Sequence, residues 1–503
     1  MTRLGAPGFR AATIANYATV GGQSLRTLIV ARILSPAQFG ILNITNVGSN
    51  LTAYTDIGAG IHGERLAAEE RGRGDLEASR RRLIESGGAR MFPALVFAGL
   101  LAAGAVVAWM LGLPETALPL AFIAVSAPLM ALWLACRGWL HVHGEIRSIM
   151  WCQMAQVTIW LTIVPAAAFA AGLPGALFAM AFSYVPPIAI ASRWAPVTRL
   201  VVPRWTALRN LVGHGFALWV IQLSMFGFVN SDQVIISTLA GSAALGHYAI
   251  AMLVATALAA LSDGAALSGH VKTLETVARQ GYLSPRIPSV TTVMHTAQAG
   301  FGILVPLAWV GAAVMIHFFL PQYVAGLPAV ALLGAGMSLM GVVVSSNSAL
   351  LSCNLHRRVP FVYLCAIAVK AVAAYFLVSV WPGVVGVAAA SLLGSLTVGL
   401  GMVLLLSTAF RRPRRSVVRL ATEFLTGGVT LAILAIWVVS SYLENGVSGF
   451  LVTSLYALPI SVAVHAAVYL WFVPRRPNPP SPPTATNPRE SAPVGERTHD
   501  QLP

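Results

Sequence analysis

The segments ILSPAQFG (residues 33–40) and LAGSAALG (residues 239–246) stand 206 residues apart and share one pattern. Each segment ends an apolar run, makes a short turn, and enters the next apolar run at its closing glycine. That next run ends at an aspartate followed by a basic stretch, with Asp56 in the first half and Asp263 in the second. The pairing predicts an internal repeat.

The composition around these segments is that of a polytopic membrane protein. Hydrophobic residues make up 57% of the 503 residues and charged residues 10%, and the mean hydropathy is +0.75. Ordinary soluble domains carry about 25% charged residues, so a soluble enzyme is excluded. Fourteen apolar runs long enough to cross a bilayer can be marked, the second from Phe39 to Ile61 and the third from Met91 to Gly112.

The positive charge follows the topology of these runs. The net charge of +15 and the isoelectric point of 10.4 would suggest nucleic-acid binding in a soluble protein. Here all but three of the 32 Lys and Arg residues lie at the termini or in alternate connections. This is the asymmetry of the positive-inside rule, so we expect both termini in the cytoplasm and no nucleic-acid partner.

The repeat and the run count together predict an all-α polytopic membrane protein of about 14 transmembrane helices. Six runs separate the two halves, so we expect the halves to have the same orientation and to be related by an axis along the membrane normal, with a site between two bundles. The predicted parts are residues 1–210 with a cytoplasmic loop at 62–90, residues 211–415, two additional C-terminal helices at 416–473, and a disordered Pro-rich cytoplasmic tail at 474–503.

Three basic residues remain outside the cytoplasmic connections: Arg26, Arg32 and Lys370. Arg26 and Lys370 lie too deep in their runs to reach the interface easily, so each one either faces a polar cavity or pairs with a buried carboxylate. Arg32 lies at the outer end of its run, where its side chain either extends to the interface or binds substrate. We expect these cations to attract an anionic substrate, and phosphate is the anion that Arg binds best.

Polar stripes accompany these cations on three of the runs. Asn16, Gln23 and Arg26 share one helical face in the first run, and three asparagines in the second run are spaced i, i+3, i+7. Such stripes either line a hydrated path or hold helices together. The predicted cavity lining comprises Asn16, Gln23, Asn43, Asn46, Asn50, Asn230 and Gln233.

Three carboxylates fall within or at the ends of the runs: Asp232, Asp56 and Asp263. Asp232 stands at the position that the repeat makes equivalent to Arg26, so it either couples to an ion or is the structural partner of a buried cation. Asp56 and Asp263 lie near inner ends of runs, where an interfacial carboxylate or a coupling role is expected.

Enzyme signatures are missing from the sequence. There is no phosphate-cradling GxxxxGK, no nucleophile elbow and no HExxH, so we predict no catalytic residue, no metal site and no cofactor. The outer connections are also too short to carry the catalytic groove of a membrane glycosyltransferase, polymerase or ligase. The expected energy source is an ion gradient, with H⁺ or Na⁺ as the possible coupling cation, or the membrane potential.

Three stretches resemble a known family: ARILSPAQFGILNITNV (residues 31–47), YTDIGAG (residues 54–60) and NSDQVIISTLAGSAALGHYAIA (residues 230–251). They are similar to bacterial polysaccharide transporters, the lipid-linked oligosaccharide flippases of the multidrug/oligosaccharidyl-lipid/polysaccharide exporter superfamily. Arg32 and Gly40 match the first-loop motif of that family, and Asp232 matches its acidic position in the seventh helix.

The resemblance implies two six-helix bundles related by pseudo-two-fold symmetry plus two C-terminal helices. It also implies a flippase of the bacterial cytoplasmic (inner) membrane that works by alternating access. Its substrate would be an undecaprenyl-pyrophosphate-linked oligosaccharide repeat unit used for O-antigen (lipopolysaccharide), capsule or exopolysaccharide biosynthesis. Its partners would be this substrate, membrane lipid and other polysaccharide assembly proteins. Two alternatives from the same superfamily stay open, an ion-coupled multidrug antiporter and a peptidoglycan-precursor flippase.

Overall fold

The computed structural model describes residues 6–195, 204–259, 288–352, 355–409 and 414–472, and all regular structure in these ranges is helical. The elements of the first half are α1 (Ala6–Ile33), α2 (Pro36–Leu51), η1 (Thr52–Tyr54), α3 (Ala59–Gly72), α4 (Leu76–Met110), α5 (Pro114–His143), α6 (Ile146–Phe182) and α7 (Val185–Ala191). Those that follow are α8 (Trp205–Leu239), the helix Gly241–Ala259, α10 (Pro288–Phe319), η3 (Pro321–Gly326), α11 (Leu327–Ser352), η4 (His356–Arg358), α12 (Val359–Val380), α13 (Val384–Ala409) and α14 (Arg414–Phe472).

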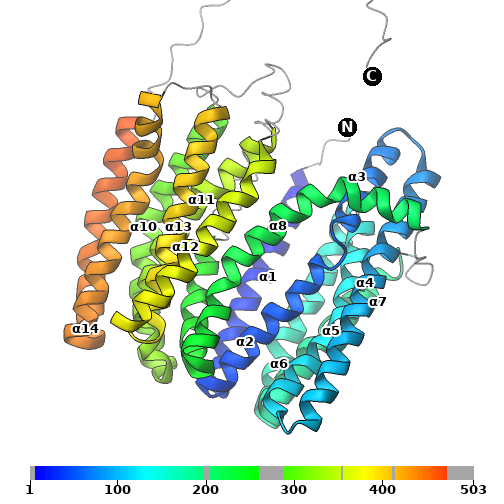
Figure 1. Cartoon of the computed structure of the whole chain (residues 1–503), viewed down its shortest axis with the longest axis horizontal. Helices are drawn as coiled ribbons and strands as arrows, with labels where there is room; N and C mark the ends of the chain where they lie inside the picture. Colours follow the sequence, from blue (N-terminus) through cyan, green and yellow to red (C-terminus); the bar gives the residue numbers. More distant parts are fainter. Residues whose placement is uncertain (1–5, 196–203, 260–287, 353–354, 410–413, 473–503) are drawn as a thin grey trace, which may run out of the picture.

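The protein is a multi-pass membrane protein. Ten of the described helices are long and apolar enough to cross a bilayer. Two of these ten span 46 residues each, and each is broken at a glycine with positive φ, Gly172 (φ 60°) or Gly446 (φ 62°). Glycine adopts this left-handed conformation without the steric cost of a Cβ, so the chain folds back there as a hairpin (Figure 1).

The more polar α1 and α2 are not among the ten, although they run alongside the other helices in Figure 1. α1 carries a polar stripe that lowers its mean hydropathy, and α2 is short, with 16 residues. With these two helices and both arms of each hairpin, the architecture agrees with the predicted all-α fold of about 14 spans.

The first segment quoted above forms the turn between α1 and α2. Ser35 caps α2: its Oγ accepts a hydrogen bond from the Gln38 backbone N–H (3.4 Å), and the Gln38 side chain accepts one from the Ser35 N–H (3.3 Å). Pro36 stands at the first helical position, where its missing N–H costs no hydrogen bond. A reciprocal capping box with Pro at this position explains why two helices meet in so short a turn.

The two repeat segments touch each other, and the contact is reciprocal. A Cβ placed on Gly40 would lie 2.0 Å from the carbonyl oxygen of Ser242, and a Cβ on Gly246 would lie 1.9 Å from that of Pro36. Pro36 and Ser242 are 206 residues apart, as are Gly40 and Gly246. Each glycine therefore contacts the residue that the repeat makes equivalent to the other glycine's partner. This is the contact pattern that a two-fold relation generates.

The predicted loop at 62–90 is instead helical, and the second run is shorter than predicted. α2 ends at Leu51 rather than Ile61, because the chain turns through Ile57 and Gly58 with positive φ. α3 and the first turns of α4 then occupy the loop region. Ion pairs at i+3 or i+4 stabilise these charged helices, as Arg65–Glu69 (3.0 Å) shows.

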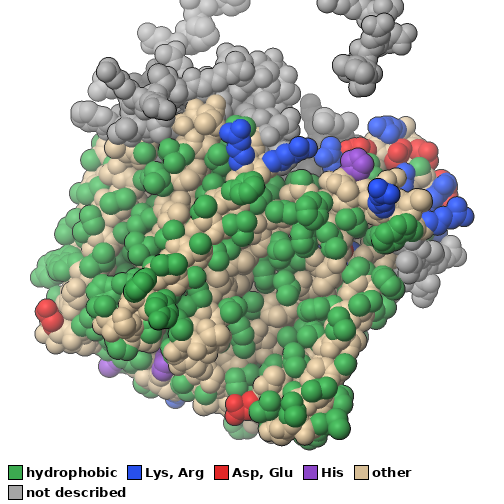
Figure 2. All heavy atoms as spheres, viewed as in Figure 1, with side chains coloured by type: hydrophobic (Ala, Val, Ile, Leu, Met, Phe, Trp, Pro, Cys, Tyr) green, Lys and Arg blue, Asp and Glu red, His purple; other side chains and the backbone are tan. Residues whose placement is uncertain are grey.

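We call the end of the molecule with α3 and the start of α4 the basic end, and the opposite end, with the α1–α2 turn, the far end. Figure 2 shows Lys and Arg side chains gathered over α3 and α8 at the basic end, while hydrophobic side chains cover the sides of the helices. The predicted tail at 474–503 lies outside the described residues. The domain boundaries near residues 210 and 415 stay predictions.

Candidate functional site

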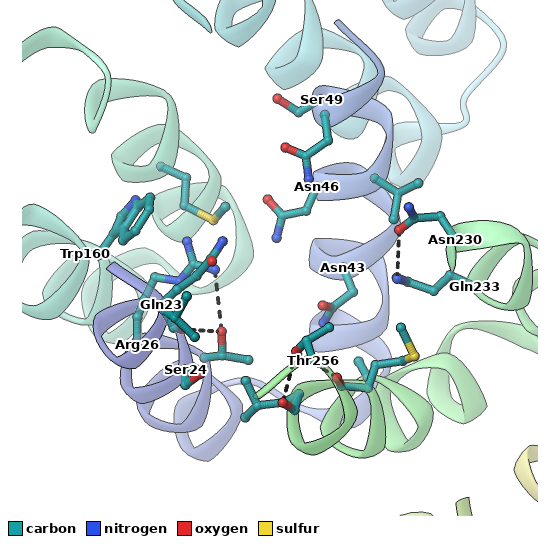
Figure 3. A pocket seen from close by; sticks show the side chains of 18 of the residues that line it. Gln23, Ser24, Arg26, Asn43, Asn46, Ser49, Trp160, Asn230, Gln233 and Thr256 are labelled. Carbon is teal, nitrogen blue, oxygen red and sulfur yellow. Dashed lines mark hydrogen bonds between the residues drawn. The ribbon is translucent and has the colours of Figure 1, made fainter. Parts of the chain in front are cut away.

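A cavity of about 430 Å³ lies among α1, α2, α6, α8 and the helix Gly241–Ala259 (Figure 3). It therefore lies between helices of both halves of the repeat. Arg26, Gln23 and Trp160 lie on one side of it, and Asn43 and Asn46 extend from α2 on the other. Its polar lining in the described residues comprises Gln23, Ser24, Arg26, Thr27, Asn43, Asn46, Ser49, Asn50, Ser183, Tyr184, Asn230, Gln233 and Thr256, together with Trp160.

Arg26 is the cation of this cavity. Its side chain is 8% exposed, and its guanidinium carbon lies 5.3 Å from the centroid of the Trp160 ring, a cation–π contact. Its Nη2 donates a long hydrogen bond of 3.5 Å to Thr27 Oγ1. No carboxylate in the described part of the chain forms an ion pair with it. Most of its five N–H donors are thus left for a ligand.

The tryptophan beneath Arg26 is held in place. Trp160 Nε1 donates to Ser183 Oγ (3.1 Å), and Ser183 donates in turn to the Met180 carbonyl (2.7 Å). Gly22 lets α1 approach α6 closely, since a Cβ there would lie 2.5 Å from the Val157 side chain. The cation and its aromatic support are therefore fixed by the packing of α1 on α6.

Amide side chains form the opposite wall. Asn43 Nδ2 donates to the Phe39 carbonyl (2.8 Å), and Gln233 Nε2 donates to Asn230 Oδ1 (3.4 Å). These bonds use donors, and Gln233 Oε1 is buried without a hydrogen-bond partner in the described structure. Asn46 makes no hydrogen bond to a described residue and points toward the Arg26 side. Asn46 therefore offers both the N–H donors and the oxygen acceptor of its amide, with which sugar hydroxyls can form hydrogen bonds.

Most predicted lining residues gather around this cavity. Gln23, Asn43, Asn46, Asn50, Asn230 and Gln233 line it together with Arg26. The side chain of Asn16 and the whole of Asp263 lie outside the described residues. Arg32 is exposed at the far end and does not reach the cavity. The role of each lining residue in binding stays a prediction.

Lys370 does not line the cavity. Its side chain is 1% exposed and its Nζ forms an ion pair with the carboxylate of Asp232. The same Nζ donates to the Phe228 carbonyl (2.7 Å) and lies 4.2 Å from the centroid of the Phe228 ring. Of the two alternatives that the sequence left open for Lys370, the structure has the buried ion pair.

Asp232 is saturated by the same network. Its second oxygen accepts a hydrogen bond from the Tyr248 hydroxyl (2.6 Å), which lies 3.2 Å from Ser391 Oγ. The network joins α8, the helix Gly241–Ala259, α12 and α13. This buried charge pair is electrically neutral, and neither of its residues lines the cavity.

Asp56 is also bound within the protein. Its carboxylate accepts hydrogen bonds from the N–H groups of Gly58 (2.9 Å) and Gly60 (3.1 Å), which fixes the turn into α3. Arg90 of α4 donates to Asp56 (3.1 Å) and to Glu64 (2.5 Å). The sequence interpretation counted Arg90 only as a cytoplasmic loop charge, and no local pattern marks it as the centre of this cluster.

A second contact between the halves, which the sequence reasoning missed, lies at the basic end. Trp219 of α8 donates to the Tyr54 carbonyl (2.7 Å). A Cβ on Gly58 would lie 2.5 Å from the Gly215 carbonyl oxygen, so these backbones touch. The rings of His62 and His214 stack at 5.2 Å.

The stacked pair perturbs His62. Burial, the His214 ring and Arg65 lower the pKa of His62, in that order of importance, and Arg82 adds to the effect while Glu69 opposes it. Together with the glycine contact at the far end, the halves therefore touch at both ends of the molecule, with the cavity between them.

An apolar hollow of about 500 Å³ adjoins the cavity between α1, the helix Gly241–Ala259 and α10. The two spaces share the lining residues Ser24 and Leu253. The rest of the hollow is aliphatic apart from one glycine, with Leu28, Val254, Ala257, Leu258, Leu304, Leu307, Ala308, Gly311, Ala312 and Met315. A polar cavity and an apolar hollow thus lie side by side.

No family model and no curated protein matches the chain. Solved structures match over most of its length. The chain is similar to an inward-facing multidrug resistance MATE family transporter of the MOP superfamily (15% identity, TM-score 0.56, 80% of this chain and 96% of that one). It is also similar to the lipid II flippase MurJ in an inward closed conformation (12% identity, TM-score 0.59, 92% and 98%).

The chain has the fold of the MOP-superfamily transporters. A third match is a MOP superfamily transporter from Pyrococcus furiosus, described by a reverse polarity of its binding pocket (14% identity, TM-score 0.54, 82% and 96%). At these identities the fold is shared by multidrug transporters and a lipid flippase alike. The polysaccharide-transporter family suggested by the sequence stays a prediction.

Proposed function

We propose that the protein is a flippase that moves a lipid-linked oligosaccharide, an undecaprenyl-pyrophosphate-linked repeat unit, across the bacterial cytoplasmic membrane by alternating access. The observation that carries the proposal is the lining of the central cavity. In its described part it holds one arginine, many amides and no carboxylate. Arginine binds phosphate oxygens, and amides bind sugar hydroxyls.

The adjoining apolar hollow supports a substrate that is part lipid. A polar headgroup in the cavity and its prenyl chain in the hollow beside it would each lie in a matching environment. One of the similar structures is named as a lipid II flippase, so this fold also occurs in a protein that moves a lipid. We propose transport rather than catalysis, and we assign the protein no catalytic residue.

The multidrug antiporter is the competing function. Cationic drugs favour an acidic, aromatic site, and a buried arginine without a carboxylate partner repels them. The similar transporter described by a reverse polarity of its binding pocket is a precedent for a changed substrate charge in this fold. A peptidoglycan-precursor flippase shares the proposed chemistry and differs only in the sugar.

We propose that the basic end faces the cytoplasm, since Arg residues crowd α3 and α4 there. The substrate then enters from the basic end and leaves at the far end. Coupling to H⁺ or Na⁺ and the association with other polysaccharide assembly proteins stay predictions.

The test is a flipping assay in proteoliposomes that contain the full chain. The probe is a short polyprenyl pyrophosphate with a fluorescent disaccharide, and a membrane-impermeant quencher reports how much of it reaches the outer leaflet. We expect fast flipping by the wild type and slow flipping by Arg26→Gln. Arg32→Gln is the matched control, because Arg32 is exposed and lies away from the cavity.

Two results would overturn the proposal. One is a flipping rate equal to that of empty liposomes in protein that is folded. The other is uptake of a cationic dye under an ion gradient with no flipping of the probe, which would favour the multidrug antiporter.

A further inference from the structure

The charge of the cavity is small and well defined. Among its described lining residues Arg26 is the only charged side chain. Lys370, the other buried cation that the sequence marked, is neutralised by Asp232 and lies outside the lining. The described lining therefore offers one positive charge, whereas the sequence predicted three cations, Arg26, Arg32 and Lys370.

That charge lies on one side only. Arg26 and Trp160 lie together where α1 packs on α6, whereas the wall formed by α2 and α8 carries amides (Figure 3). On that wall Asn43 donates to a backbone carbonyl and Gln233 donates to Asn230, and Gln233 Oε1 is buried without a partner in the described residues. A ligand that fills the cavity meets a cation at one end and amide oxygens at the other.

We infer that the cavity selects a headgroup whose sugar next to the phosphate linker is uncharged, such as a hexose or an N-acetylhexosamine, over one with a uronic acid. This inference rests on the proposed flippase function and adds the charge class of its glycan. One anionic group of the linker pairs with Arg26, and the sugar hydroxyls donate to the amide oxygens.

A uronate fits this cavity badly for two reasons. Its carboxylate adds a third negative charge to the two of the pyrophosphate, although Arg26 is the one cation in the described lining, and an uncompensated buried charge is strongly disfavoured. It also only accepts hydrogen bonds, so it can use the N–H groups of the wall amides but not their oxygens, whereas a sugar hydroxyl can use both.

The wall offers a place to reverse this preference. Asn46 is half-buried, lines the cavity and makes no hydrogen bond to a described residue. Asn46→Lys adds a second cation without removing a contact and supplies the charge that a uronate needs. Asn445→Lys is the matched control, because Asn445 is exposed between the arms of α14 and lies away from the cavity.

The experiment measures binding of two probes to the purified full chain in nanodiscs. The probes are a short polyprenyl pyrophosphate linked to glucose and the same lipid linked to glucuronate, with the sugar-free lipid as a reference. We expect the wild type and Asn445→Lys to bind the glucose probe at least about tenfold more tightly than the glucuronate probe. Asn46→Lys should reduce that ratio to about one or invert it.

Equal or tighter binding of the glucuronate probe by the wild type would overturn the inference, whatever the variant does. If Asn46→Lys does not fold, Gln233→Lys serves as the second variant on the same wall. If neither sugar probe binds better than the sugar-free lipid and no flipping occurs, the proposed function itself fails, and this result is distinct from a wrong charge preference.

Discussion

Arg26 and Lys370 carry the same signal in the sequence and have opposite fates in the structure. Both are buried cations on transmembrane helices. Arg26 stacks on Trp160 and borders a cavity, with no carboxylate partner in the described residues. Lys370 has an aspartate, a carbonyl and an aromatic ring within reach. The difference shows that the function of a buried charge depends on whether the fold supplies a counter-charge.

The largest effect is expected from breaking the Lys370 pair. Lys370→Met leaves Asp232 buried without its counter-charge, which should cost about 3–5 kcal/mol of the free energy of unfolding. Thermal unfolding in detergent measures it. The double variant Lys370→Met with Asp232→Asn should recover much of that loss, because no unpaired charge then remains. Equal melting temperatures for wild type and Lys370→Met would show that the pair is not a structural element.

Arg26 should show the opposite behaviour. Arg26→Gln removes a charge that no described carboxylate balances, so we expect the melting temperature to change little. Binding of the polyprenyl pyrophosphate probe should weaken by about 2–3 kcal/mol, which corresponds to roughly 30- to 150-fold. Arg26→Lys should lie between the two, since a lysine keeps the charge but loses the planar fork. A strong loss of stability with unchanged affinity would show that Arg26, like Lys370, has a structural role and does not bind the probe.

The contact between the halves at the far end should respond to a single methyl group. Gly40→Ala places a Cβ 2.0 Å from the Ser242 carbonyl oxygen, so the far ends must separate at a cost of about 1–3 kcal/mol. A cysteine at Asn46 should then react faster with an impermeant thiol reagent added at the far end. Gly99→Ala is the control, because nothing lies within 4 Å of a Cβ there. Equal rates in both variants would mean that the glycine contact does not close the cavity.

The smallest effect is expected at the basic end, where the contact between the halves is titratable. The pKa of His62 is lowered in this arrangement, so the neutral ring is favoured and the contact is fully stable above the ordinary pKa of about 6.5. As the pH falls below that value, the separated state binds the proton more readily and the contact weakens, by less than about 1 kcal/mol.

Spin labels on α3 and α8 measure the separation of these helices by pulsed electron resonance. The distance distribution should broaden at pH 5.5 in the wild type and stay unchanged in His62→Gln. Labels across the Gly40–Gly246 contact should respond to pH equally in the wild type and in His62→Gln, because His62 lies at the opposite end of the molecule. A response between α3 and α8 that persists in His62→Gln, or no response in the wild type, would remove the histidine pair as the cause.

The sequence predicted the helical membrane fold, the repeat and the residue types of the cavity from local patterns. Charge asymmetry sets topology, and polar residues at i, i+3 and i+7 share a face of any helix. The stripe of Asn43, Asn46 and Asn50 therefore lines the cavity together. The helices within residues 62–90 were not predicted, because a charged stretch without an apolar run was interpreted as a connection between spans.

What the sequence by itself determined is which segments cross the membrane and which residues are too polar to face lipid, because both follow from transfer free energies of single residues. Only the tertiary structure decided which spans are central. The span Pro321–Val344 is 89% buried and Val359–Val380 is 22% buried, although their hydropathies are 2.1 and 2.2.

The tertiary structure likewise decided that Asp232 stands beside Lys370 rather than Arg26, and that Asp56 meets Arg90. The interaction energy of an ion pair depends on the distance between the charges and on their surroundings, which the whole fold sets. Asp232 and Lys370 are 138 residues apart, so no local sequence pattern indicates that they pair.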